Sequence, residues 1–326
     1  MKRKSLLLLT IFLICFSLYL FYVQEKKNTL EIHIGYQSVT SQTWGALVVK
    51  EKKTFEKKLE NLYPEKKIKV VWHDEMSGAI INTSMISSKI QFGFMGDMPL
   101  ILNMYKAHTI EGYNSSLIAF DGKGAGGINQ SILVAKESDI KSIKELKGKT
   151  ISTPIGSSAH FMLMKILEKN NILDDVEIVH QDVALASQLL SSKKTDAFAI
   201  WAPYPNFLED KDIGRILVDG SESEIDYLAG VIVDQDYAVD NPLIVKAFLE
   251  SLDEAHDFIN NNPEEAAKIF SKQSGFSLDI TMKETKNIKW DSSIDEKDIA
   301  TMIEKQNFLI SLNQVESFDM KKYISE

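Results

Sequence analysis

Short apolar, β-rich runs alternate with longer amphipathic stretches along most of the chain. The short runs cover residues 31–36, 67–73, 91–95, 116–121, 131–136, 150–154, 177–181 and 197–202, and each is typical of a buried strand. Between them, apolar positions recur at helical spacing, as in residues 159–167. Strands that alternate with helices predict βαβ units, and therefore an α/β fold with a mainly parallel sheet.

The order of these elements changes along the chain and indicates its domains. Residues 30–115 and 116–232 each alternate strands and helices, whereas only helical patterns follow Asn241. A helical block cannot form a sheet domain alone, so we expect it to return to the first lobe. The prediction is a first lobe of residues 30–117 plus 235–326 and a second lobe of residues 118–234. Crossings near 118–123 and 231–235 make a hinged cleft, a geometry suited to closure around a ligand.

The N-terminal segment departs from this pattern. Residues 5–23 carry no charge and follow Lys2, Arg3 and Lys4, which predicts a signal peptide or membrane anchor over residues 1–23, with a linker over 24–29. No small-residue cleavage motif follows, so an uncleaved anchor competes with a cleaved signal peptide. A lipid on Cys15 is a further alternative, which the bulky Ile14 before it disfavours. In each case we expect an exported protein held at or near the membrane.

Composition narrows the possible partners. The net charge is −9 although three cations lie in the N-terminal segment, so the acidic body excludes a nucleic-acid partner. Cys15 is the only cysteine, and the body therefore has no disulfide. The only arginines are Arg3 and Arg215. An anionic ligand must consequently rely on helix N-termini, hydroxyls, the Trp201 N–H, His160 or a lysine.

Two of the turns that follow strands are candidate anion sites. Ser157 and Ser158 lie between a strand and a helix, where free N–H groups face the carboxyl end of the sheet. Gly96 and Asp97 occupy the same place after an earlier strand, with Asp97 as the expected N-cap. The competing interpretation is that these residues only cap their helices, and the Asp97 carboxylate would also repel an anion.

Two further turns supply polar and aromatic side chains. Gln37 and Ser38 follow the first strand, and Trp44 comes shortly after them, where it either stacks on a ligand or packs in the core. Trp201 ends a strand and has the same two alternatives, a cavity wall or core packing.

Motifs for catalysis are absent from the sequence. It contains no H-E-x-x-H, C-x-x-C, G-x-S-x-G or P-loop. Residues 122–127, GKGAGG, superficially resemble a phosphate loop, but they precede a strand and not a helix, so we interpret them as a flexible loop between the lobes. We therefore expect a binding protein that is not an enzyme and uses no cofactor and no metal. Two alternatives remain: an enzyme that pairs His160 with Asp97, and a metal-binding or sensor protein that uses the scattered histidines, for example in residues 73–75.

Four segments, in this order, resemble one family. They are LEIHIGYQS, SGAIINTSMISSKIQFGFMGDMPLIL, SIKELKGKTISTPIGSSAHFMLMKILEKNNI and TDAFAIWAPYP. Together they resemble the substrate-binding proteins of ABC importers in the nitrate/sulfonate/taurine class, over about the whole exported chain. The resemblance implies a type II periplasmic-binding-protein fold, whose two lobes close on a small solute and deliver it to a permease.

The resemblance also implies site residues and partners. Carried over to this chain, the ligand contacts are Gln37, Ser38, Gly96, Asp97, Met98, Ser157, Ser158, Ala159, His160 and Trp201. The implied ligand is a small organic anion such as an alkanesulfonate or taurine. The alternatives are nitrate, an aromatic acid or a pyrimidine precursor. The implied partners are an ABC permease and its ATPase, and the protein is expected to act as an extracytoplasmic monomer.

Overall fold

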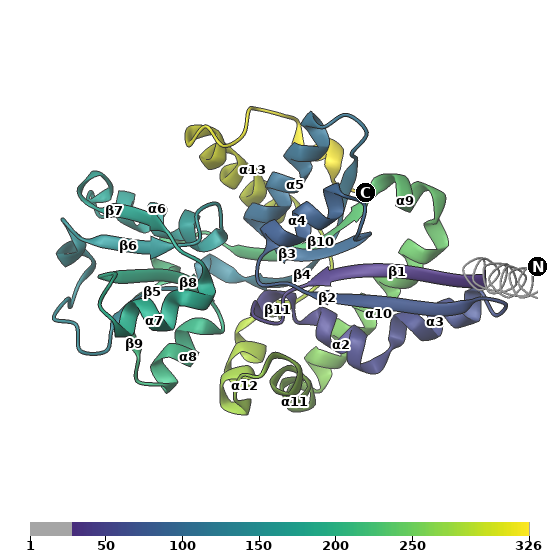
Figure 1. The fold of residues 1–326 in the computed structure, drawn as a ribbon, viewed down its shortest axis with the longest axis horizontal. Coiled ribbons are helices and arrows are strands. Elements are labelled where there is room, and N and C mark those ends of the chain that lie inside the picture. The colour runs from purple at the N-terminus through teal and green to yellow at the C-terminus, as the bar shows by residue number, and fades with distance from the viewer. Residues whose placement is uncertain (1–27, 326) are drawn as a thin grey trace, which may run out of the picture.

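The computed structural model describes residues 28–325 and contains two β-sheets flanked by helices (Figure 1). The predicted N-terminal segment 1–23, Cys15 and most of the linker 24–29 lie outside the described residues. Within residues 28–325, no helix combines the length and apolar character that crossing a membrane requires.

The larger sheet has six strands in the order β11-β4-β10-β3-β1-β2. Their bounds are β1 Thr29–Tyr36, β2 Lys67–Asp74, β3 Phe92–Gly96, β4 Ser115–Gly124, β10 Tyr227–Asp234 and β11 Lys289–Trp290. Strand β1 runs parallel to β2 and β3, whereas β10 runs antiparallel to both β3 and β4.

The smaller sheet has five strands in the order β7-β6-β8-β5-β9. Their bounds are β5 Gln130–Ala135, β6 Thr150–Thr153, β7 Glu177–His180, β8 Ala197–Trp201 and β9 Gly214–Asp219. Strand β6 is parallel to β7 and β8, and β5 is antiparallel to β8 and β9. The sheets are therefore mixed, and the expectation of a mainly parallel sheet is wrong. The reason is that β4, β10, β5 and β9, which lead into and out of the second sheet, pair in the antiparallel direction.

Helices cover both faces of each sheet. Those packed on the larger sheet are α2 Gly45–Lys52, α3 Thr54–Leu62, α4 Gly78–Ile86, α5 Asp97–Thr109, α9 Gln235–Asp240, α10 Pro242–Asn261, α11 Pro263–Ser274, α12 Leu278–Asn287 and α13 Glu296–Ser311. Those on the smaller sheet are α6 Ser158–Lys169, α7 Ala186–Ser191 and α8 Tyr204–Asp210. Proline opens α10 and α11, where its missing N–H costs no hydrogen bond.

Each sheet separates two apolar clusters. On one face of the larger sheet, Trp44, Phe92, Phe248 and Phe270 are fully buried with α2, α3, α10 and α11. On its other face, the cluster includes Met85, Met104 and Met302 beneath α4, α5 and α13. The smaller sheet has the same layered plan. The helical segment after Asn241 thus packs back on the first sheet.

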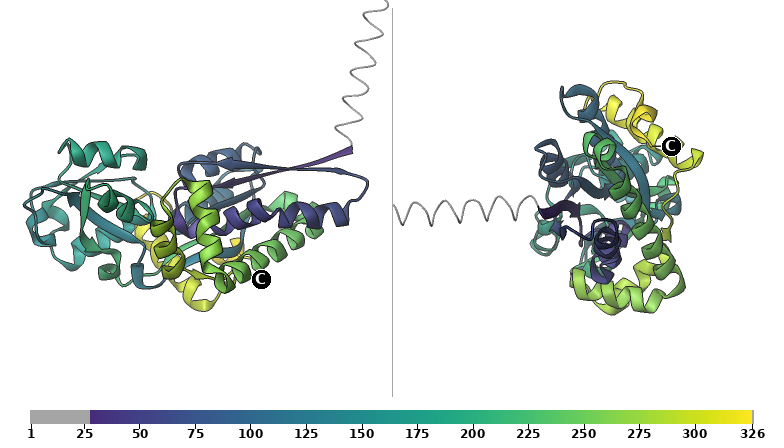
Figure 2. Two further views of the ribbon diagram at one scale, coloured as in Figure 1. Left: turned by 90° about the horizontal axis from the view of Figure 1, so that it is seen from below. Right: turned by 90° about the vertical axis from the view of Figure 1, so that its right-hand side faces the viewer.

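We call the part built around the larger sheet lobe 1 and the part built around the smaller sheet lobe 2. Figure 2 shows an elongated molecule with lobe 2 at one end. The predicted crossing 118–123 falls within β4, and the crossing 231–235 covers the end of β10 and the first residue of α9. Divided by its sheets, the chain enters lobe 2 after Gly124 and leaves it before Tyr227.

Candidate functional site

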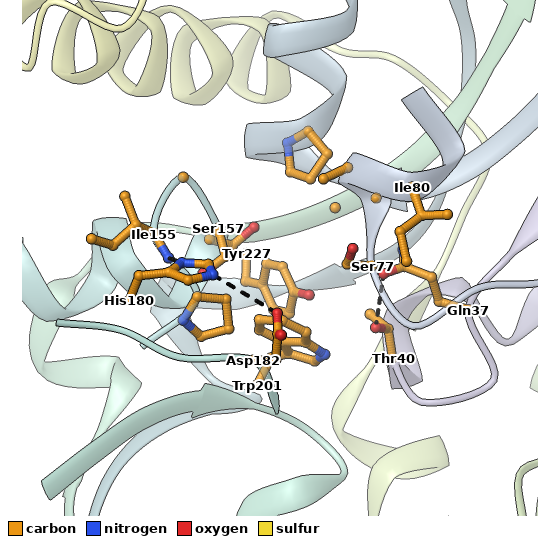
Figure 3. Close-up of a pocket in the computed structure, with 17 residues that line it drawn as sticks. Gln37, Thr40, Ser77, Ile80, Ile155, Ser157, His180, Asp182, Trp201 and Tyr227 are labelled. Carbon is orange, nitrogen blue, oxygen red and sulfur yellow. Dashed lines mark hydrogen bonds and ion pairs between the residues drawn. The ribbon is translucent and has the colours of Figure 1, made fainter. Parts of the chain in front are cut away.

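A cavity of about 330 Å³ lies between the two lobes (Figure 3). Lobe 1 contributes Gln37, Thr40, Ser77, Gly78, Ala79, Ile80, Gly96 and Pro99, and also Tyr227 at the start of β10. Lobe 2 contributes Pro154, Ile155, Gly156, Ser157, Ser158, His180, Asp182 and Trp201. Five predicted site residues line this cavity: Gln37, Gly96, Ser157, Ser158 and Trp201.

The topology explains why these segments meet. Strands β1, β2 and β3 of lobe 1 are parallel, and so are β6, β7 and β8 of lobe 2. Their carboxyl ends open toward the space between the sheets, and the segments that follow them line the cavity. This is the place where open α/β sheets bind ligands.

The N-terminus of α6 faces the cavity from lobe 2. Ser157 caps the helix: its Oγ accepts from the His160 N–H at 3.2 Å, and its carbonyl accepts from the Phe161 N–H. The first N–H groups of a helix have no partner within it. In α6, those of Ser158 and Ala159 remain available at the helix start. They place the positive end of the helix dipole at the cavity.

A second helix N-terminus reaches the cavity from lobe 1, and the sequence analysis missed it. Ser77, Gly78 and Ala79 line the wall where α4 begins, and the Ser77 hydroxyl makes no capping bond. The Ser77 carbonyl accepts from the Ile80 and Ile81 N–H groups, which leaves those of Gly78 and Ala79 for a ligand. A serine-glycine pair between a strand and a helical stretch was the available signal.

Aromatic and aliphatic side chains form most of the remaining wall. Trp201 is 5% exposed, and its Nε1–H has no hydrogen-bond partner among the described residues. A buried donor without a partner is costly, and a ligand oxygen would satisfy it. Burial, together with the nearby Asp97 charge, raises the pKa of Tyr227, so its hydroxyl stays a donor. Ile80 and Ile155 add exposed apolar surface at the mouth.

No lysine or arginine lines the cavity in the described part of the chain, and its one carboxylate is Asp182. His180 Nδ1 accepts from the Ile155 N–H at 3.1 Å, and its Nε2 lies 3.8 Å from Asp182 Oδ1. Figure 3 shows this pair on the lobe 2 side. Arg215 is held by the Ser138 and Ile140 carbonyls and does not line the cavity. An anion bound here would therefore depend on helix ends and neutral donors.

Four predicted contacts lie behind the cavity wall. They are Ser38, Trp44, Met98 and Ala159, and none of them lines the cavity.

 Trp44 donates its Nε1–H to the Ser38 carbonyl at 2.8 Å, and its ring lies 4.9 Å from that of Phe270 at a tilt of 37°, so of its two alternatives the structure shows packing. Ser38 in turn donates its N–H to Asp74. Met98 and Ala159 are fully buried in the cores of lobes 1 and 2. These four residues support the wall from behind.

Asp97 is also buried behind the wall, where it is the first residue of α5 and Gly96 is the N-cap. Its carboxylate accepts from the Met98 N–H, the Ser158 hydroxyl, the Leu228 N–H and the Lys305 ammonium. With four donors already bound, Asp97 is not available to a ligand. It also removes the N-terminus of α5 from the set of free anion sites.

His160 is buried, with 5% of the residue exposed. Its Nδ1 accepts from the Gly156 N–H at 3.4 Å, and its ring lies 6.0 Å from that of Phe308. Burial lowers the pKa of His160 to about 4. The ring is therefore neutral near pH 7 and supplies no positive charge to an anion.

This pKa predicts how stability depends on pH. In the unfolded chain His160 takes up a proton near pH 6.5, whereas in the folded protein it does so only near pH 4. The contribution of the neutral His160 to the free energy of unfolding is fully present above pH 6.5 and is lost as the pH falls toward 4. Denaturant unfolding of the wild type and of His160→Gln across this range measures it. We expect a smaller loss of stability in the variant, and equal losses would contradict the assignment.

Neither the side-chain pair that the enzyme alternative needs nor the cluster that the metal-binding alternative needs is present among the described residues. No hydrogen bond joins His160 to Asp97, since each is held by other partners. His73 Nε2 lies 2.8 Å from His33 Nδ1 on the outside of lobe 1, and Asp74 binds the Ser38 N–H. Within residues 28–325 there is no cluster of three or more His, Cys, Asp or Glu side chains that would hold a metal ion.

Comparison with known proteins agrees with this geometry. The sequence model described as NMT1/THI5 like matches residues 128–266, which include β6, α6 and β8 of the site. Over this part, the chain is similar to the NMT1/THI5-like family. A Bacillus subtilis (strain 168) relative, named as a binding protein for aliphatic sulfonates, is 28% identical over 84% of this chain and 79% of its own.

Two further matches extend over most of this chain. The taurine-binding periplasmic protein of Escherichia coli (strain K12) is 28% identical over 74% of this chain and 71% of its own. The alkanesulfonate-binding protein of Xanthomonas axonopodis pv. citri, solved with MOPS, has a TM-score of 0.76 at 19% identity and covers 90% of this chain and 98% of its own. The predicted resemblance and the periplasmic-binding-protein fold are confirmed.

Proposed function

We propose that this protein is the extracytoplasmic solute-binding component of an ABC importer, and that its lobes close on a small organic sulfonate. The observation that carries the proposal is the cavity between the lobes, which two helix N-termini reach and which Trp201 lines, with an Nε1–H that has no partner among the described residues. These groups donate hydrogen bonds without carrying a full charge. They suit a group with several weakly basic oxygens, such as a sulfonate.

The apolar wall accounts for the rest of the ligand. Trp201, Tyr227, Ile80 and Ile155 surround the space beyond the helix ends. A cavity of about 330 Å³ is larger than an inorganic anion such as nitrate would fill, and organic ligands occupy cavities of this size. An alkyl or aromatic tail would cover this surface and exclude water. Binding followed by release needs no chemistry, and the protein acts without catalysis.

The names of the relatives support the proposed partners. Relatives are named as periplasmic and sulfonate- or taurine-binding proteins, and another relative is named as part of an ABC transporter. On this basis we place the protein outside the cytoplasm, next to a permease and its ATPase. The apolar segment 5–23 would tether the receptor there and raise its local concentration.

A thermal-shift screen of the full chain tests the proposed ligand class. The panel contains propane-1-sulfonate, taurine, an aromatic sulfonate, the matching carboxylates, nitrate and a pyrimidine. A ligand at a hundred times its Kd stabilises by about 2.7 kcal/mol, which gives a clear shift. We expect organic sulfonates to raise the melting temperature most. Stabilisation by carboxylates or the pyrimidine alone, or by nothing in the panel, would contradict the proposal.

The carboxylate in the wall leads to a separate prediction. Asp182 lines the cavity with its side chain 79% exposed, so it repels an anion through a largely solvated path. Asp182→Asn should tighten binding of propane-1-sulfonate by about two- to fivefold, the size of exposed charge effects. Asp174→Asn removes the same charge from lobe 2 away from the cavity and serves as the control. Weaker binding by Asp182→Asn in titration would contradict this prediction.

A further inference from the structure

We infer that Asp97 and Lys305 are positioning residues that fasten Ser158, and with it the start of α6, to lobe 1. The inference rests on the proposed function only in that α6 supplies the ligand's donors. The fastening itself is a contact between lobes. It therefore favours the closed arrangement even before a ligand binds.

The contact joins four separate elements. Asp97 begins α5 in lobe 1, and its Oδ1 accepts the Ser158 hydroxyl of lobe 2 at 2.5 Å. Its Oδ2 accepts the Leu228 N–H of β10 at 2.8 Å and the ammonium of Lys305 from α13. The side chains of Asp97 and Lys305 are 0% and 2% exposed. One buried carboxylate is thus hydrogen-bonded to residues of both lobes and to the strand that leads from lobe 2 into lobe 1.

Lys305 is itself fixed in place. Its ammonium also donates to the Asp226 carbonyl at 2.7 Å and lies 5.4 Å from the centre of the Phe161 ring of α6. The position of this cation balances the Asp97 charge directly behind the cavity. Without it, a bare carboxylate beside the site would repel the anion that α6 is placed to bind.

Ser158 connects this buried ion pair to the cavity. Its hydroxyl proton is committed to Asp97, while its backbone N–H belongs to the free first turn of α6. Gly96 allows the close approach, because a Cβ at this position would lie 3.1 Å from Ser158 Oγ. When the lobes separate, Ser158 leaves Asp97 and takes the α6 donors with it.

The test measures the distance between lobes in the ligand-free protein. In a Cys15→Ser background, spin labels at Lys57→Cys on α3 and Lys194→Cys in lobe 2 report this distance, and both positions are exposed. Removing a hydrogen bond to a charged group should shift the closed-to-open ratio about tenfold toward open in Ser158→Ala. Ser158→Thr keeps the hydroxyl and should restore the wild-type distribution.

Ser157→Ala is the matched control, because Ser157 lines the same cavity and caps α6 but makes no bond to Asp97. It should leave the distance distribution unchanged. An unchanged distribution in Ser158→Ala, or an equal shift in Ser157→Ala, would overturn the inference. The distance measurement does not depend on the ligand. If Ser158→Ala opens the lobes but the protein does not bind a sulfonate, only the proposed function is refuted. If the protein binds a sulfonate but Ser158→Ala leaves the distance unchanged, only this inference is refuted.

Discussion

Replacement of Lys305 by methionine is expected to lower the free energy of unfolding by about 3 kcal/mol, near the lower end of what breaking a buried ion pair costs. The reason is that Asp97 stays buried and loses its cationic partner, while the three neutral donors remain. Denaturant unfolding of the wild type and the variant measures the difference.

Two further variants separate charge from packing. Lys297→Met lies on the same helix and breaks an ion pair with Asp226, but the Lys297 side chain is 70% exposed, so we expect a loss below about 1 kcal/mol. The double variant Asp97→Asn/Lys305→Met removes both charges and should recover part of the stability lost in Lys305→Met. A Lys305→Met variant as stable as Lys297→Met would show that the buried pair is not important for the fold.

The second large effect is expected at Trp201. Trp201→Phe keeps an aromatic wall but removes the unpaired Nε1–H, and we expect sulfonate binding to weaken at least about tenfold, as loss of a hydrogen bond to a charged group does. The unliganded variant should lose less stability than a buried Trp→Phe change that also breaks a hydrogen bond, because the Trp201 donor has no partner among the described residues to lose. Titration and thermal unfolding together measure the two effects.

Trp290→Phe is the control for this substitution. Trp290 is also buried, but it does not line the cavity and its Nε1–H donates to the Thr285 carbonyl at 3.1 Å. We expect it to lower stability and to leave affinity unchanged. If Trp290→Phe weakened binding as much as Trp201→Phe, the effect would come from general destabilisation and not from a donor in the site.

Local patterns in the sequence were enough to predict most strands and several helices. Each of the eight apolar runs overlaps a strand, because alternating or continuous burial leaves a direct trace in the residues. The relative directions of the strands could not be predicted from the sequence in the same way. The pairing of β10 with β3 and β4 joins segments more than a hundred residues apart, and no local pattern specifies whether such strands run parallel or antiparallel.

The site was predicted in outline because local patterns reveal the strands that its segments follow. The turns at Gln37, Gly96, Ser157 and Trp201 follow strands, so topology alone brings them together. The role of Asp97 depends on Lys305, which comes much later in the chain, and that ion pair has no signal in either segment. The sequence therefore predicts the N-terminus of α5 as the second anion site, whereas in the structure the free N-terminus at the cavity in lobe 1 is that of α4.

Calorimetric titration of the full chain with propane-1-sulfonate, in the wild type and in Trp201→Phe, measures whether the cavity binds an organic sulfonate. We expect saturable binding at one site, a negative heat-capacity change from burial of the apolar tail, and at least about tenfold weaker binding in Trp201→Phe. Absence of saturable binding, or equal affinity in the two proteins, would contradict the claim that this cavity binds an organic sulfonate.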